Sequence, residues 1–476
     1  MVVEAAESGM LISPAAPGAG AGAGIALHGH RLSTVVPASV TGEAVDYELA
    51  DADLLHKLHY LRAVHVFRAT APAPGAGAGA GAGALTMRAL KEPMFQWLDM
   101  YFPVSGRLRR RHGGDAAAVV SDGDGAAAAA AGRPYVRCND CGVRVVEAAC
   151  DVTVDEWLEE EASRGGRARM LSYDKVIGPE LFFSPLLYVQ ITSFKCGGMA
   201  VGFTWAHLIG DIPSAAACFS AWAQLVSGKK PTPPVLRGPL AAPPSTPPAG
   251  ATAPPSVKAA AAPVGDHWAV PTTGDMAPFS FHVTEQQLDG LRLGAPAGHR
   301  HVGPFELVAA LVWRALAAVR GAGEETTPRT VTVVKAGGGG TGLSNGHRIG
   351  HVVVAGGDAA VAERGVAELA ALLAGARLDD GGAAAAWAAA AGADAVVYGA
   401  NLTFVDAGEV DVYGGLELAG RRPAHVEYAV DGVGDGGAAV VHRDAGGRGR
   451  TVAAVVRRGE ADRLRAAMRD ALRVDA

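Results

Sequence analysis

The chain has little of several features that would assign it to a class at once. Its 476 residues include five cysteines, too few for a disulfide framework, so we expect a reducing compartment. Lys and Arg (42) do not outnumber Asp and Glu (48). The chain therefore has no basic excess that would indicate binding to nucleic acid or to an anionic membrane. No apolar run approaches the roughly 18 residues of a spanning helix. The N-terminus has Glu4 and Glu7 where a signal peptide has basic residues. These absences favour a globular protein that reaches a membrane only through a partner.

Length and composition predict two domains. The chain is 49% hydrophobic and 19% charged, as in soluble enzymes, and is long enough for two cores. A stretch rich in Pro and Ala, 228–271, predicts an extended crossover linker without packed structure. We therefore expect an N-terminal domain at 25–227 and a C-terminal domain at 272–476. Patches of Ala and Gly predict mobile loop insertions at 15–24, 75–84, 126–131, 337–340 and 382–391.

Hydrophobic periodicity predicts mixed α and β structure in both halves. Segments 186–194 and 199–205 alternate like paired strands, and 305–319 has helical spacing. The terminal segment 459–473 is an expected amphipathic helix with Leu464, Met468 and Leu472 on one stripe. Such a stripe either packs on its own domain or docks a partner, and we favour packing.

The most informative segment is 188–214, in which a strand runs into a tight turn and then a helix. The turn presents His207 and Asp211 as H-x-x-x-D. Pro213 suits the first turn of a helix, and Asp211 is then well placed as its N-cap. By residue type alone, Asp211 is a helix cap and His207 a half-buried histidine with one hydrogen bond. The position just before the linker favours a site, because clefts between domains are common binding places.

Other patterns carry less weight. Residues 432–437 fit G-x-G-x-x-G, but a strand follows instead of a helix, so we predict a hairpin turn. One C-x-x-C, Cys138 and Cys141, has no second ligand pair, so we expect no zinc site. Three further groups have structural interpretations: a helix surface for His56 and His59, a loop for His299 and His301, and the core for Trp97, Trp205, Trp222 and Trp313.

Several longer motifs resemble a known family. Residues 101–108 are similar to YFP-x-x-GRL and 194–198 to F-x-CGG, which together with H-x-x-x-D characterise the BAHD acyl-CoA-dependent acyltransferases of plants. Within that family, the wax-associated Glossy or Eceriferum branch is the most similar. The segments that carry this likeness are 35–43, 57–62, 90–107, 133–151, 196–211, 265–271, 279–284 and 420–437.

The resemblance implies a fold and a mechanism. The implied fold is α/β, with two chloramphenicol-acetyltransferase-like domains, a central channel between them and His207 at its middle, in a monomer. His207 is then the general base that deprotonates an acceptor for attack on acyl-CoA, worth roughly 10²–10⁴-fold in rate. Asp211 points away and holds the histidine loop. Neither a bound cofactor nor a metal is implied, and acyl-CoA is the expected substrate or ligand.

Two departures from the family pattern weaken the catalytic interpretation. Ile212 follows Asp211 where most active members have glycine. The second motif, Asp-Phe-Gly-Trp-Gly, is missing, and 411–418 stands there without a tryptophan. Loss of an oxyanion donor typically costs about 10²–10³ in rate. Both departures are shared by the wax branch, which is implied to act with a 3-ketoacyl-CoA synthase of the fatty-acid elongase.

Three function classes therefore stay open. The first is an accessory factor for very-long-chain fatty acid elongation in cuticular wax synthesis, in the cytosol and on the cytosolic face of the endoplasmic reticulum. The second is an active acyl-CoA-dependent acyltransferase with His207 as base. The third is a binding protein that only inherited the fold. We favour the first, with the second close behind because His207 and Asp211 are both present.

Overall fold

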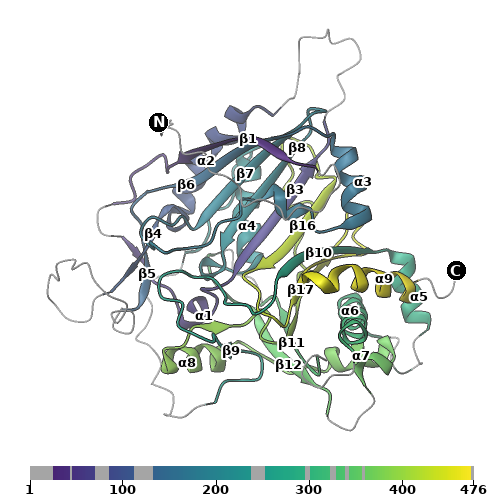
Figure 1. The fold of residues 1–476 in the computed structure, drawn as a ribbon. Helices are drawn as coiled ribbons and strands as arrows, with labels where there is room; N and C mark the ends of the chain where they lie inside the picture. Colours follow the sequence, from purple (N-terminus) through teal and green to yellow (C-terminus); the bar gives the residue numbers. More distant parts are fainter. Residues whose placement is uncertain are drawn as a thin grey trace, which may run out of the picture.

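Two large sheets with helices packed on them make up the described part of the chain (Figure 1). The structure is a computed structural model. It describes residues 25–42, 45–69, 85–111, 132–236, 252–294, 298, 301–321, 328–337, 342–355 and 360–472. Among these residues, no helix combines the length and the apolar character that crossing a bilayer demands.

The first sheet comes mostly from the N-terminal half. Its neighbours are antiparallel except for β6 and β7, which run parallel. The predicted pairing of 186–194 with 199–205 is confirmed by β7 and β8, with Ile191 opposite Val201. In spatial order, the strands are β1 Leu27–Val35, β6 Val143–Cys150, β7 Leu187–Phe194, β8 Met199–Ala206, β3 Tyr60–Phe67 and β16 His425–Asp431.

The second sheet lies in the C-terminal half. It is mixed, because β15 is parallel to both β11 and β17 while the remaining pairs are antiparallel. In spatial order, its strands are β10 Met276–Val283, β18 Arg450–Arg457, β17 Ala438–Arg443, β15 Leu402–Asp406, β11 Thr330–Lys335, β12 Arg348–Val353 and β13 Leu378–Asp379. Two small sheets accompany it: β2 Asp46–Tyr47 with β5 Pro134–Arg137 and β4 Arg107–Arg110, and β9 Lys258–Ala259 with β14 Ala395–Val396.

Helices cover both sheets and close their cores. α2 and α4 pack together on the first sheet through the predicted core residues Trp97 and Trp222, whose rings lie 6.3 Å apart. Trp205 and Trp313 are buried as well, so all four tryptophan predictions are confirmed. The helices are α1 Asp51–Leu54, α2 Met87–Met100, α3 Val154–Arg164, α4 Ile212–Val226, α5 Glu285–Leu293, α6 Pro304–Arg320, α7 Val366–Ala374, α8 Gly382–Ala391 and α9 Ala461–Ala471.

The terminal helix α9 packs on its own half. Leu464 and Met468 are fully buried among α6 and the second sheet, and Leu472 packs beside them. Burial of such side chains stabilises a fold by about 1.5–3 kcal/mol each. The preferred interpretation of this stripe as a packing surface is therefore confirmed.

One strand crosses between the two halves. β16 lies in sequence between β15 and β17 of the second sheet, yet it pairs with β3 of the first sheet, with Asp431 opposite Tyr60. The next strand, β17, returns to the second sheet. Residues 432–437 therefore connect two sheets, and the predicted hairpin turn is wrong, although Gly432 and Gly437 do have the positive φ expected of glycine there.

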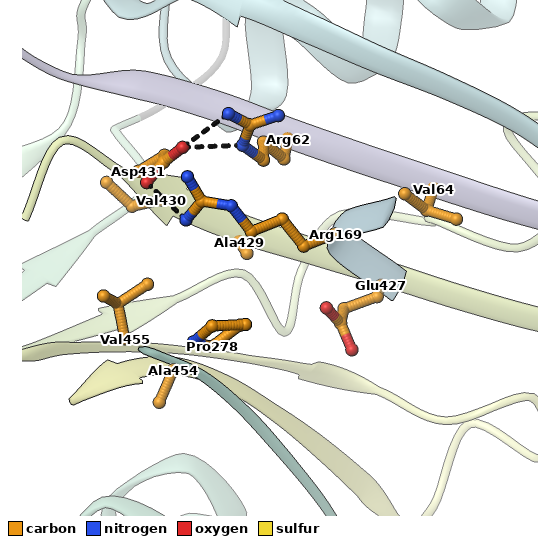
Figure 2. A pocket seen from close by; sticks show the side chains of 10 residues that line it. All are labelled: Arg62, Val64, Arg169, Pro278, Glu427, Ala429, Val430, Asp431, Ala454 and Val455. Carbon is orange, nitrogen blue, oxygen red and sulfur yellow. Dashed lines mark hydrogen bonds and ion pairs between the residues drawn. The ribbon is translucent and has the colours of Figure 1, made fainter. Parts of the chain in front are cut away.

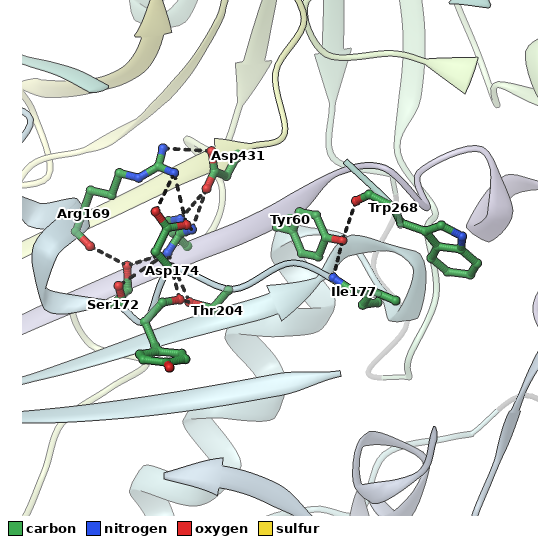
Figure 3. Close-up of polar contacts among 10 residues, drawn as sticks. Tyr60, Arg169, Ser172, Asp174, Ile177, Thr204, Trp268 and Asp431 are labelled. Atoms are coloured by element: carbon green, nitrogen blue, oxygen red, sulfur yellow. Dashed lines mark hydrogen bonds and ion pairs between the residues drawn. The ribbon is translucent and has the colours of Figure 1, made fainter. Parts of the chain in front are cut away.

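A buried ion-pair network fixes this crossing strand (Figure 3). Asp431 accepts hydrogen bonds from Arg62 Nε at 2.7 Å and Arg169 Nη1 at 2.9 Å. Arg62 also reaches Asp174 at 2.7 Å. Burial alone would raise the pKa of Asp431, but the two guanidinium groups outweigh it and lower the pKa to about 2. The halves are thus joined by charge as well as by strand pairing.

The described part of the linker is packed against both halves. Trp268 is fully buried, and its carbonyl accepts a hydrogen bond from Tyr60 Oη at 2.7 Å (Figure 3). Tyr60 Oη in turn accepts one from Ile177 N at 2.8 Å. β9 pairs with β14. The expectation of a linker without packed structure is therefore wrong for 252–271, because a buried tryptophan and a strand anchor it.

The Ala- and Gly-rich patches have mixed outcomes. Residues 382–391 form helix α8, whose Ala384, Ala385 and Ala388 are buried. The loop prediction is wrong there, because alanine has the best helix propensity and these three lie on one packed face. The patches at 15–24, 75–84 and 126–131 lie outside the described residues, as does 337–340 apart from Gly337.

Candidate functional site

The H-x-x-x-D segment lies where β8 ends and α4 begins. His207 opens a short 3₁₀ turn, His207–Ile209, directly after β8. Gly210 follows with a φ of 159°, and a Cβ there would lie 2.7 Å from Ser214 Cβ. Trp205 Nε1 donates to the carbonyl of Gly210 at 2.9 Å, which holds the turn against the core. The tight turn therefore fixes the backbone of His207.

Asp211 is the N-cap of α4, as the sequence indicated. Its Oδ1 accepts a hydrogen bond from Ser214 N at 3.1 Å. Its Oδ2 accepts one from Gly346 N at 3.0 Å, so the same carboxyl also holds a loop of the C-terminal half. Burial raises the pKa of Asp211, and these hydrogen bonds act against the rise. Within the described residues, these hydrogen bonds of the carboxylate go to backbone N–H groups and not to the His207 ring, as is typical of a structural residue.

His207 is enclosed where the two halves meet. Only 1% of the surface of His207 is exposed. Its Nε2 lies 2.9 Å from Tyr398 Oη. Its carbonyl accepts a hydrogen bond from Asn345 Nδ2 at 3.0 Å. Nδ1 of His207 has no hydrogen-bond partner among the described residues. His207 thus lies among residues of both halves, and its ring does not face open solvent.

Three more histidines surround His207. The His56 ring stacks on it at 4.6 Å, and His347 meets His56 edge-on at 4.4 Å. His59 Nε2 accepts from Val397 N at 3.0 Å while its Nδ1 lies 2.8 Å from the carbonyl of Gly432. With one ring nitrogen accepting and the other donating, His59 is the neutral Nδ1–H tautomer. His59 is therefore uncharged, and it belongs to a tightly packed cluster of buried rings.

Burial sets the basicity of this cluster. Burial, and to a smaller extent the neighbouring His347, lower the pKa of His207 to about 3. Burial likewise lowers the pKa of His59 to about 3 and that of His347 to about 4. A general base works best when its pKa lies near the ambient pH. In this enclosed state His207 is neutral but a weak base.

The sequence interpretation missed most of this cluster. His56 and His59 were expected on a helix surface, but both are buried, because the helix at 51–54 ends before them. His347, Asn345 and Tyr398 come from the C-terminal half, far from the motif in sequence, and nothing in their spacing indicated the contact. Of the pair His299 and His301, the first lies outside the described residues and the second is exposed in a turn.

The loop in place of the family's second motif connects β15 to β16. Asp411 Oδ1 accepts from Gly414 N at 2.8 Å, so the aspartate closes its own turn. Val412 and Leu416 are buried in the core. This loop thus carries apolar packing and an aspartate turn, without a tryptophan.

Two cavities lie elsewhere. One of about 20 Å³ is lined by Arg62, Arg169, Glu427 and Asp431 between the two large sheets, and is the size of one water (Figure 2). The other, of about 340 Å³, lies beside the first turns of α4 and the loop at 409–415. His207 lines neither cavity.

In the described ranges, no group of three or more His, Cys, Asp or Glu residues is arranged so that it could hold a metal ion. Cys138 is buried and Cys141 exposed, and both are free thiols.

The fold defines a class of protein. It is similar to the crystal structure of vinorine synthase, with a TM-score of 0.61 and 16% identity over 92% of this chain and 96% of that one. It is also similar to F. graminearum TRI101 complexed with coenzyme A and deoxynivalenol, with a TM-score of 0.58 and 15% identity over 89% and 97% of the two chains. The chain has the mixed α/β acyltransferase fold, and the expected two-domain architecture is consistent with it.

Sequence comparison then gives the family. The model of the Transferase family matches residues 29–337, and the chain therefore belongs to this family, the BAHD proteins that its motifs resemble. Protein ECERIFERUM 2 of Arabidopsis thaliana is 37% identical over 421 residues, which are 86% of this chain and 90% of that protein. Protein ECERIFERUM 26 of the same plant is 35% identical over 450 residues, 92% and 94% of the two chains. The likeness to the Eceriferum branch thus extends over most of the chain.

Proposed function

We propose that this protein promotes very-long-chain fatty acid elongation in cuticular wax synthesis together with a 3-ketoacyl-CoA synthase. The observation that carries the proposal is the enclosed His207, whose pKa is lowered to about 3 within a chain similar to Eceriferum proteins over nearly its whole length. A buried weak base suits a protein that uses the acyltransferase fold without turnover. The loop at 411–418, which lacks the family's tryptophan, supports the same role.

The proposal includes a ligand, a state and a place. The ligand is acyl-CoA, the substrate class of the family, and the related fold of TRI101 was crystallised with coenzyme A. The protein acts as a monomer in the cytosol and on the cytosolic face of the endoplasmic reticulum. It reaches that face through the condensing enzyme.

Co-expression in a heterologous host tests the proposal. The chain is expressed with a 3-ketoacyl-CoA synthase, and the acyl chain length of the products is measured. We expect longer products than with the condensing enzyme alone, and His207→Ala should retain the shift. His351→Ala, at an exposed histidine, is the matched control. Unchanged chain lengths with every condensing enzyme tried would contradict the proposal.

A second candidate function is acyl transfer to an O- or N-acceptor with His207 as general base. The observation in its favour is that both residues of the H-x-x-x-D motif are present, with Asp211 capping α4. In this case His207→Ala should abolish both activity and the chain-length shift while the protein stays folded.

A further inference from the structure

The hydroxyl group of Tyr398 lies where an acceptor would have to lie. A general base must come within about 2.6–3.2 Å of the proton that it removes. Tyr398 Oη lies 2.9 Å from His207 Nε2, so the tyrosine hydroxyl occupies the position within reach of this nitrogen. The two rings are tilted by 33° with centroids 5.3 Å apart, so the tyrosine also covers part of the imidazole.

The backbone holds Tyr398 firmly in this place. Its carbonyl accepts a hydrogen bond from Gly434 N at 3.0 Å, and the preceding Val397 N donates to His59. The following Gly399 has a φ of 86°, and a Cβ there would meet Gly434 N at 2.4 Å. The contact with His207 is therefore built into the connection between β14 and β15.

The other sides of the His207 ring are closed as well. His56 stacks on one face, and His347 lies edge-on with its ring centroid 5.9 Å away. These neighbours come from both halves, so an external acceptor reaches Nε2 only if Tyr398 leaves. Tyr398 itself is fully buried, and its aromatic ring is rigid.

We propose that Tyr398 is an internal plug that occupies the acceptor's place on His207 and keeps this imidazole inaccessible. The proposal rests on the proposed accessory function and deepens it, because it gives a physical reason why a chain with an intact H-x-x-x-D motif does not turn over acyl-CoA. The plug acts on accessibility and is separate from the missing tryptophan of the second motif.

Diethyl pyrocarbonate labelling of the full chain, read by peptide mass spectrometry, tests the plug. The reagent modifies neutral imidazoles that it can reach. In the wild type we expect His207 to react about tenfold or more slowly than the exposed His267 and His351. Tyr398→Ala should raise the His207 rate about tenfold or more, because the plug is gone. Equal rates for His207 and His267 in the wild type would overturn the proposal.

Matched variants separate a plug from a loosened fold. Tyr428 is another buried tyrosine, with its ring 5.6 Å from that of the buried His65. Tyr428→Ala should expose His65 and leave His207 protected, whereas Tyr398→Ala should do the reverse. A rise at His65 as large as that at His207 in Tyr398→Ala would count against a plug. If Tyr398→Ala fails to fold, Tyr398→Val removes the ring and the hydroxyl while keeping a short apolar side chain, and it must still speed labelling of His207.

The labelling result and the chain-length result are independent. Loss of the chain-length shift in the wild type would remove the accessory function while His207 stayed protected. Fast labelling of His207 in the wild type would remove the plug while the chain-length shift remained.

Discussion

Asp211 offers a direct test of the structural role assigned to it. Asp211→Ala removes two hydrogen bonds, the cap on Ser214 N and the contact with Gly346 N. Loss of an N-cap costs about 0.5–2 kcal/mol. Loss of a further hydrogen bond costs about 0.5–1.5 kcal/mol. We therefore expect the free energy of unfolding, measured by urea denaturation, to fall by about 1–3.5 kcal/mol.

A second cap serves as the matched control. Thr153 caps α3 by accepting from Glu156 N at 3.2 Å, and its cap bond stays within its own helix end. Thr153→Ala should cost about 1 kcal/mol, and the excess for Asp211→Ala measures the bond to the C-terminal half. Asp211→Asn keeps one acceptor oxygen and should fall between the wild type and Asp211→Ala. A loss below about 0.5 kcal/mol for Asp211→Ala would refute the cap.

Three further predictions concern stability. The lowered pKa of Asp431 contributes about 2 kcal/mol of stability above pH 3.8, and this contribution is lost as the pH falls toward 2. Urea denaturation at pH 6 and pH 3 should therefore show a loss of about 1 kcal/mol from this group. Asp431→Asn should cost about 3 kcal/mol at pH 6, the low end for a broken buried ion pair, because Arg62 and Arg169 lose the carboxylate that they share while Arg62 keeps Asp174. The acid dependence should flatten, and unchanged acid sensitivity would contradict this. Leu464→Ala should lower the free energy of unfolding by about 2–5 kcal/mol, whereas Asp462→Ala, at an exposed position, should change it little. The Leu464→Ala protein that remains folded should still co-purify with a condensing enzyme, because this side chain packs inside its own half.

Local patterns were predictable from the sequence, and contacts between distant segments were not. The strand pair β7–β8, the helix cap at Asp211 and the buried tryptophans each follow from residues a few positions apart. The crossing of β16 depends on the pairing of Asp431 with Arg62, 369 positions apart in the chain, and no periodicity signals it. A resemblance to known motifs gave the family and the fold, because these motifs extend along most of the chain.

The site shows the same division. The motif identified His207 and Asp211, but it contains no information about Tyr398, which lies 191 positions from His207 in the chain. His56 and His59 looked like a helix surface because the two are polar and three apart. They are buried because α1 ends at Leu54 and the chain turns inward between the two halves. Burial then sets the low pKa of the cluster, which composition does not reveal.

The central claim is that this chain acts on fatty-acid elongation without using His207 as a base. The most direct measurement is the acyl chain-length profile of a host that expresses a 3-ketoacyl-CoA synthase with either the wild type or His207→Ala. The account predicts the same shift to longer chains with both proteins. A shift that disappears in a folded His207→Ala protein would contradict it.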